Sequence, residues 1–343
     1  MWQVIGQQRV VSLLKKGIEK GSPANAYLFI GPPHVGKMKL AINTAQAMNC
    51  QGNEPPCLEC DSCQKIAQGK HVDVHIISMD SNFKDDETKH RAEISIEQIR
   101  RIQHAASLPP FEGKYKLFII NGADFLSLEA ANCLLKTLEE PCRQVCFILL
   151  AKNIKTIPAT VISRCQKLEL TPVSVVEVER ELVDNYAVET QRARVLSALS
   201  KGSIGWAISA CRNEELLEHY RENRSVILDI INEDFEERFS YAARLAGQFN
   251  KNRYIVLELL NIWVDIWRDL LLVKTGLTKA ITNIDIKKRL EQLGRDLDLY
   301  DIRRFILEIQ ETINNLRRNT NARLALEVMM MNIPKRKKEK RGS

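Results

Sequence analysis

The sequence has no hydrophobic run that stays free of charge over the length of a membrane span. Its most apolar stretch, residues 255–273, contains two aspartates, a glutamate and an arginine, which a lipid-exposed helix would not carry. We therefore expect a buried helix there and no membrane segment. Met1-Trp-Gln-Val also leads directly into a polar helix, with no cleavable signal. These absences predict a cytoplasmic protein. The sequence also contains no internal repeat, so a solenoid is not expected.

The charge balance also lacks a strong bias outside one short segment. The formal net charge is +7, but residues 335–343 alone hold six Lys/Arg and one Glu. The remaining chain is close to neutral, and this does not by itself indicate a nucleic-acid binder. We predict that residues 334–343 form a disordered basic tail, and DNA contact through this tail stays an open alternative.

Nine cysteines without a secretion signal favour a reducing compartment, where thiols or a metal site are more common than disulfides. Four of them, Cys50, Cys57, Cys60 and Cys63, lie close together in a loop that contains Gly and Pro. Four thiolates satisfy the tetrahedral preference of Zn²⁺ and leave no open position, so we predict a structural zinc site. Unpaired thiols and an iron–sulfur cluster remain alternatives. The other five are interpreted as small core residues: Cys133, Cys142, Cys146, Cys165 and Cys211.

The order of the predicted elements indicates an α/β domain followed by an all-α part. Up to about residue 171, helical segments alternate with short apolar runs, which is the pattern of a largely parallel sheet. After Pro172 the strand signals stop, and we expect a small helical unit over 172–212 and long amphipathic helices over 213–333. The five strands are predicted at 27–30, 74–78, 116–120, 145–150 and 166–170.

The first predicted strand leads into a glycine-containing loop and then a helix. Gly31, Gly36 and Lys37 have the spacing of a P-loop, in which backbone N–H groups and a helix N-terminus hold phosphate. Met38 occupies the place of the Ser or Thr whose hydroxyl normally binds Mg²⁺. The loop can therefore be recognised, but one of its chemical groups is missing.

The third predicted strand ends without the acids that a P-loop ATPase needs. An Asp that holds Mg²⁺ and a Glu that orients water are replaced by Asn121 and Gly122, and Asp124 comes three residues later. We expect no hydrolysis here and weak or no ATP binding by Gly31, Gly36 and Lys37. The alternative is an autonomous ATPase with a relocated Mg²⁺ site that uses Asp124.

Several short motifs together carry a family resemblance. They are Val4-Ile-Gly-Gln7, the Gly-Pro-x-x-x-Gly-Lys loop, the four-cysteine insertion, Glu129-Ala-Ala-Asn-x-Leu-Leu-Lys-Thr-Leu-Glu-Glu-Pro141 and Ser163-Arg-Cys165. Through them, residues 1 to about 210 resemble the clamp-loader subunits of bacterial DNA polymerase III, which are AAA+ proteins. The resemblance implies an AAA+ domain with a zinc-binding insertion (50–63), a helical lid (172–212) and an oligomerisation collar (213–333).

The resemblance also implies partners and a role for one arginine. The family's gamma/tau-type ATPase subunits and delta-type subunit form a hetero-pentameric ring that opens a sliding clamp onto primed DNA. The Ser-Arg-Cys arginine, Arg164 in this chain, would act in trans as an arginine finger on ATP bound by a neighbour. Gly205 stands where motor subunits carry a nucleotide-sensing arginine. With Met38, Asn121 and Gly122, this matches the family's non-hydrolysing subunits rather than its motors.

Overall fold

The structure, a computed structural model, describes residues 2–78, 93–140, 142–318 and 320–334. The chain divides into two compact units, one within 1–178 and 202–206 and the other within 179–201 and from residue 207 onward. Apart from Pro334, the predicted basic tail lies outside the described residues. The boundaries of the predicted lid and collar stay predictions. Among the described helices, none has the length and apolar character needed to span a bilayer.

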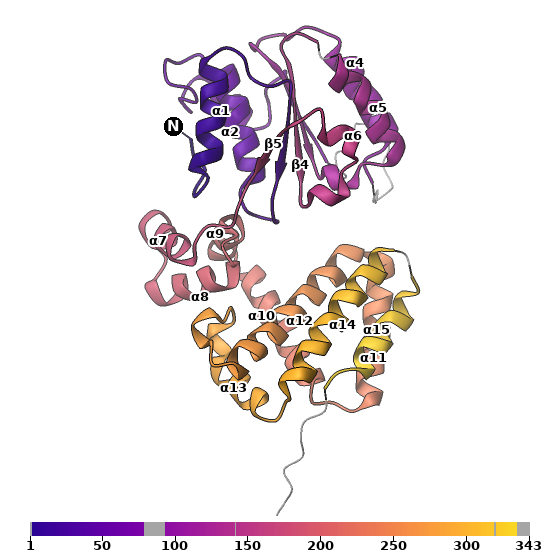
Figure 1. The fold of residues 1–343 in the computed structure, drawn as a ribbon. Helices are drawn as coiled ribbons and strands as arrows, with labels where there is room; N and C mark the ends of the chain where they lie inside the picture. Colours follow the sequence, from indigo (N-terminus) through magenta and orange to yellow (C-terminus); the bar gives the residue numbers. More distant parts are fainter. Residues whose placement is uncertain (1, 79–92, 141, 319, 335–343) are drawn as a thin grey trace, which may run out of the picture. The chain divides into compact units, whose positions relative to one another are not determined.

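The first unit is built on a five-stranded sheet in the order β2-β3-β4-β1-β5, with all neighbouring strands parallel (Figure 1). All five predicted strands are confirmed, each to within one residue at either end. In the register, Ile30 lies opposite Ala151 and Asn121 opposite Leu150, so the segments that follow these strands emerge at one edge. The strands are β1 (Ala26–Ile30), β2 (Val74–Ile77), β3 (Lys116–Asn121), β4 (Val145–Ala151) and β5 (Gln166–Glu169).

Helices cover both faces of this sheet, because alternate strand residues point to opposite sides. Tyr27 and Phe29 belong to the core under the first two helices, whereas Leu28 and Ile30 belong to the core under the helices of the other face (Figure 1). This arrangement confirms the predicted α/β domain with a parallel sheet. The helices are α1 (Gln8–Glu19), α2 (Lys37–Asn49), α3 (Asp61–Ala67), α4 (Ile96–Ala106), α5 (Leu128–Glu139) and α6 (Ala159–Ile162), with 3-10 turns η1 (Ala123–Phe125) and η2 (Ile154–Thr156).

The second unit is helical throughout its described residues. Trp263 and Trp267 on its central helix are fully buried and contact Phe305, which confirms the buried helix predicted over residues 255–273. Helices α7 (Val175–Tyr186) and α9 (Ile204–Arg212) each contribute to both units. The others are α8 (Thr190–Ser200), α10 (Glu214–Ile230), α11 (Phe235–Lys251), α12 (Arg253–Lys274), α13 (Lys287–Arg295), α14 (Leu299–Arg317) and α15 (Ala322–Met331), with 3-10 turns η3 (Thr278–Ala280) and η4 (Ile284–Ile286).

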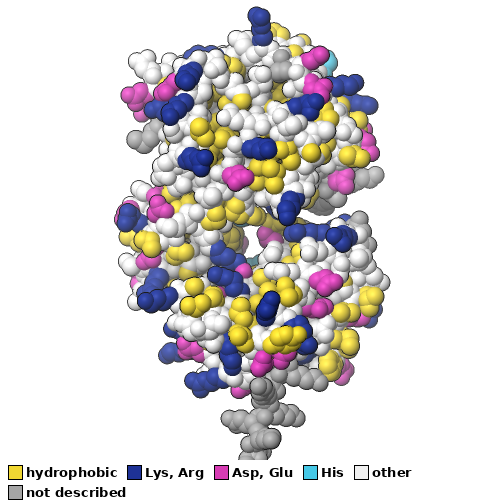
Figure 2. Space-filling view, in the orientation of Figure 1, with side chains coloured by type: hydrophobic (Ala, Val, Ile, Leu, Met, Phe, Trp, Pro, Cys, Tyr) yellow, Lys and Arg dark blue, Asp and Glu magenta, His cyan; other side chains and the backbone are white. Residues whose placement is uncertain are grey.

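Two surface properties bear on the sequence-based expectations. Lys and Arg are interspersed with Asp and Glu over the face shown in Figure 2, in keeping with a nearly neutral body. Of the isolated cysteines, Cys146 and Cys165 are buried as predicted. Cys142 is exposed, so the prediction of a core position is wrong for this residue, which lies in the loop between α5 and β4.

Candidate functional site

The phosphate loop has the strand, turn and helix that its spacing predicts. Gly36 adopts φ +105°, and a Cβ on Gly31 would lie 2.5 Å from the Leu170 carbonyl oxygen, so both positions require glycine. Lys37 Nζ donates to the Gly31 and Pro32 carbonyl oxygens at 2.5 and 2.7 Å. Burial lowers the pKa of Lys37 to about 8, although the Asp124 carboxylate opposes this shift. The lysine therefore braces the loop.

The groups that would handle Mg²⁺ and water are absent from the places that the fold gives them. Met38, in the first turn of α2, packs against the apolar core under α1 and α2. Gly122 has φ +89°, and a Cβ there would lie 3.1 Å from the Phe125 ring. The chain therefore turns in a left-handed conformation where an ATPase needs a glutamate, and side chains other than glycine are strained in it.

Asp124 serves the backbone of a neighbouring loop. One of its carboxylate oxygens accepts the Lys152 N–H at 2.7 Å, and the other accepts the Asn153 N–H at 3.3 Å and the Thr156 hydroxyl at 2.6 Å. Both oxygens thus hold the turn that follows β4. This network ties η1 to η2 and leaves the carboxylate committed to a structural task.

The phosphate loop is also joined to the start of α9. Gly205 N–H donates to the His34 carbonyl oxygen at 2.8 Å, and a Cβ on Gly205 would lie 2.7 Å from the same oxygen. A side chain at this position would push the loop away. The sequence predicted the loss of the sensing arginine here but gave no sign of this close contact.

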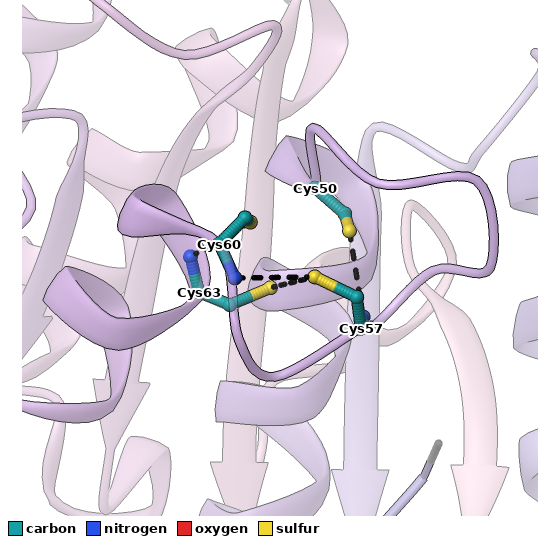
Figure 3. A group of neighbouring side chains, drawn as sticks. All are labelled: Cys50, Cys57, Cys60 and Cys63. Atoms are coloured by element: carbon teal, nitrogen blue, oxygen red, sulfur yellow. Dashed lines mark hydrogen bonds between the residues drawn. The ribbon is translucent and has the colours of Figure 1, made fainter.

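The four predicted metal ligands come together. The Sγ atoms of Cys50, Cys57, Cys60 and Cys63 all lie within 4.8 Å of one another, and those of Cys57 and Cys63 face each other at 4.0 Å (Figure 3). Four sulfurs bound tetrahedrally at the usual Zn–S distance would be about 3.8 Å apart, so small adjustments would fit the cluster to zinc.

Backbone N–H groups point at the sulfurs of Cys50, Cys57 and Cys60, whereas burial raises the pKa of the Cys63 thiol. Gly52 N–H donates to Cys50 Sγ at 3.3 Å. Cys57 N–H donates to Cys50 Sγ at 3.4 Å, and Cys60 N–H donates to Cys57 Sγ at 3.3 Å (Figure 3). Hydrogen bonds from the Cys60 and Glu59 backbone lower the pKa of the Cys57 thiol to about 6. The donor set and its surroundings therefore suit a structural metal ion.

A chain of buried hydrogen bonds connects the cysteine cluster to the helix of the phosphate loop. Gln46 Nε2 donates to the Cys63 carbonyl oxygen at 2.9 Å, and Gln46 Oε1 accepts from Asn43 at 2.8 Å. Asn43 in turn accepts the Gln3 N–H at 2.7 Å. Gln46 and Asn43 both lie on α2, so this helix links the cluster to the N-terminal segment.

Arg164 lies just beyond α6 and is exposed, whereas Val161 and Cys165 on either side of it are buried. Its guanidinium donates to the Thr160 carbonyl oxygen at 2.9 Å and to the Ser163 hydroxyl at 3.3 Å. It also forms an ion pair with Glu139 at the end of α5. Sequence reasoning missed Glu139, although the residue belongs to the Glu129–Pro141 motif. It is far from Arg164 in the sequence, and no local pattern reports the pair.

Comparisons with known proteins agree with this architecture. The family model described as "DNA polymerase III, delta subunit" matches residues 6–174. The delta' subunit of Bacillus subtilis is 28% identical over 329 residues, which cover 95% of each chain. The tau subunit of Escherichia coli is 32% identical over 213 residues, which cover 60% of this chain but 31% of tau.

Among solved structures, a gamma subunit-related protein of Thermotoga maritima is 16% identical with a TM-score of 0.48, over 94% of this chain and 98% of that one. The family match covers the residues that form the sheet, the loop and the cysteine cluster. The chain belongs to the clamp-loader family of DNA polymerase III subunits.

Proposed function

We propose that this chain is a non-hydrolysing clamp-loader subunit of the delta' type. It completes a ring with gamma/tau-type ATPase subunits and a delta-type subunit, and it supplies Arg164 to the ATP of a neighbour. Through the ring it helps to open a sliding clamp onto primed DNA. The match to a delta' subunit over nearly the whole chain supports this assignment.

The observation that carries the non-hydrolysing role is the state of Asp124. Its two carboxylate oxygens already accept three hydrogen bonds from residues 152–156, so recruiting it to Mg²⁺ would break the turn after β4. Met38 and the left-handed Gly122 remove the other two groups. This weighs against the alternative of an autonomous ATPase with a relocated Mg²⁺ site.

The position of Arg164 supports action on another chain. An arginine finger needs a guanidinium that reaches outward from a firm base, because its contribution depends on charge placed accurately at the departing phosphate. The backbone of Arg164 is held between buried Val161 and Cys165, while its guanidinium is exposed. The chain's own phosphate loop lies elsewhere, after β1.

We further propose that Cys50, Cys57, Cys60 and Cys63 hold one structural Zn²⁺. The converging sulfurs and the N–H groups that point at them support this reading. Bound zinc would cross-link the loop after α2 to α3 and would leave no open coordination position for chemistry.

The finger is tested in the reconstituted complex. Arg164→Ala should leave assembly intact and lower DNA-stimulated ATP turnover, because the site it serves loses about 10³-fold or more in rate. Arg9→Ala, which removes an exposed arginine of α1, is the matched control and should leave turnover unchanged. Turnover that does not respond to Arg164→Ala would refute the trans role.

The rival is tested on the isolated chain. We expect no Mg²⁺-dependent ATP turnover above background. Turnover that Lys37→Ala abolishes would establish an autonomous ATPase and would overturn the non-hydrolysing assignment.

A further inference from the structure

We propose that Glu139 is a positioning residue that acts as a latch: it holds the Arg164 guanidinium on the subunit surface until a neighbour's nucleotide takes its place. This inference rests on the proposed function of Arg164. It adds a second residue to that function, and it predicts that removing the carboxylate makes the finger easier to recruit.

The latch consists of three contacts on one guanidinium. One terminal nitrogen of Arg164 pairs with the Glu139 carboxylate, and the other donates to the Thr160 carbonyl oxygen and the Ser163 hydroxyl. The Thr160 contact lies within the same short segment as Arg164, so it fixes the local rotamer. Glu139, by contrast, comes from the end of α5 and supplies the only full negative charge among these contacts.

The pair is exposed enough to open. The side chains of Arg164 and Glu139 keep 34% and 49% of their accessible surface. Ion pairs in such positions contribute little to stability, because water solvates the separated charges well. The buried residues that anchor this region, Val161 and Cys165, take no part in the pair. Opening the latch therefore requires rotation of a side chain and no rearrangement of the fold.

The exchange that we infer replaces one anion by another. A guanidinium offers five N–H donors in a planar fork that suits carboxylate and phosphate oxygens alike. A triphosphate on the adjacent subunit would carry more negative charge than one carboxylate. The neighbour's nucleotide thus competes with Glu139 for the same donors, and no covalent bond is made or broken by Arg164 in this step.

Competition from the Glu139 carboxylate should lower kcat/KM for ATP, and Glu139→Gln should remove this effect. In the reconstituted complex, we expect kcat/KM for ATP to rise roughly 1.5- to 5-fold, the range that corresponds to an exposed ion pair. The rise should shrink at high salt, which screens the wild-type pair. Glu140→Gln removes the same charge from the next residue, for which the structure shows no contact with Arg164, and should leave kcat/KM unchanged.

A double-variant cycle separates the latch from a structural role. In the Arg164→Ala background, Glu139→Gln should have no effect on kcat/KM, and the melting temperature should change little in either background. A fall in kcat/KM, no change, or a rise that persists without Arg164 would each overturn the latch. If Arg164→Ala alone leaves turnover unaltered, the proposed function fails and the latch fails with it. A loss on Arg164→Ala combined with an inert Glu139→Gln removes only the latch.

Discussion

At the scale of single residues, side chains at the sheet edge after β1, β3 and β4 have residue types found in ATPase sites, but here they make structural contacts within the chain. Asp124 would be a metal ligand in a different loop, but here it accepts hydrogen bonds from residues 152–156. Lys37 braces the carbonyl oxygens of its own loop. The role of each residue follows from what lies within hydrogen-bond distance, and residue type alone does not determine it.

The backbone at Gly122 gives a prediction at this scale. Gly122→Glu restores the residue type of an ATPase, but it should lower the free energy of unfolding by about 1–3 kcal/mol, because a non-glycine residue is strained at φ +89° and its Cβ meets Phe125. Urea unfolding with hydrogen exchange of β3 as the readout measures this cost.

Asn121→Asp is the matched control for that substitution. It restores the neighbouring acid at an exposed position at the end of β3, so the unfolding midpoint should stay close to that of the wild type. Equal effects of the two substitutions would show that the left-handed turn is not the obstacle at residue 122.

At the scale of elements, the sequence was sufficient for the strands. Apolar runs located all five strands of the sheet to within one residue. The same reasoning brought the four cysteines together because they are close in the chain. It could not find the contacts Asp124–Thr156, Gly205–His34 or Glu139–Arg164, since each joins segments that only the fold brings together.

The cysteine cluster is joined to α2 by the hydrogen bond from Gln46 to Cys63, and the cluster leads to a prediction about metal removal. Protein purified without chelator should contain one zinc per chain, and Cys57→Ser should lose it. In Cys57→Ser, hydrogen exchange of the amides in residues 50–69 should accelerate strongly, because zinc-bound loops of this size have little hydrophobic core of their own.

The protection of β1 and β4 should change little in Cys57→Ser, because these strands lie in the sheet interior. Cys142→Ser removes an exposed thiol and should retain full zinc content. The proposal of a metal site would be wrong if the wild-type protein contained no zinc and its residues 50–69 exchanged at the same rate as in Cys57→Ser.

At the scale of the whole molecule, the two units have separate cores and separate polar anchors. Asp269 is fully buried in the second unit and accepts the backbone N–H groups of Thr282 and Asn283 at 3.0 and 2.7 Å, as well as the Asn283 side chain at 2.8 Å. These bonds fasten the segment after α12 onto that helix. The sequence shows Asp269 within the most apolar stretch of the chain but does not reveal its partners.

Asp269→Asn tests the independence of the units. The Asn side-chain amide would place an N–H donor against the Thr282 and Asn283 N–H groups, which are donors themselves. This should lower the free energy of unfolding of the second unit by about 2–4 kcal/mol. Loss of amide protection in α12, the helix that carries buried Trp263 and Trp267, should begin at lower denaturant, while amide protection of the sheet is retained. The control Glu218→Gln, on the exposed face of α10, should leave the unfolding of the second unit and the protection of the sheet unchanged. If Asp269→Asn destabilised the second unit and the sheet together, the two units would instead unfold as one cooperative unit.

The firm base of Arg164 has a consequence for how a ring of such subunits would work. Since Val161 and Cys165 anchor the backbone on both sides of the arginine, its reach is limited to the length of one side chain. Under the proposed function, a neighbouring ATP reacts only when the gap between two subunits narrows to that length. Because the length of the arginine side chain is fixed, ATP turnover at this subunit interface would occur only in rings in which the interface has closed.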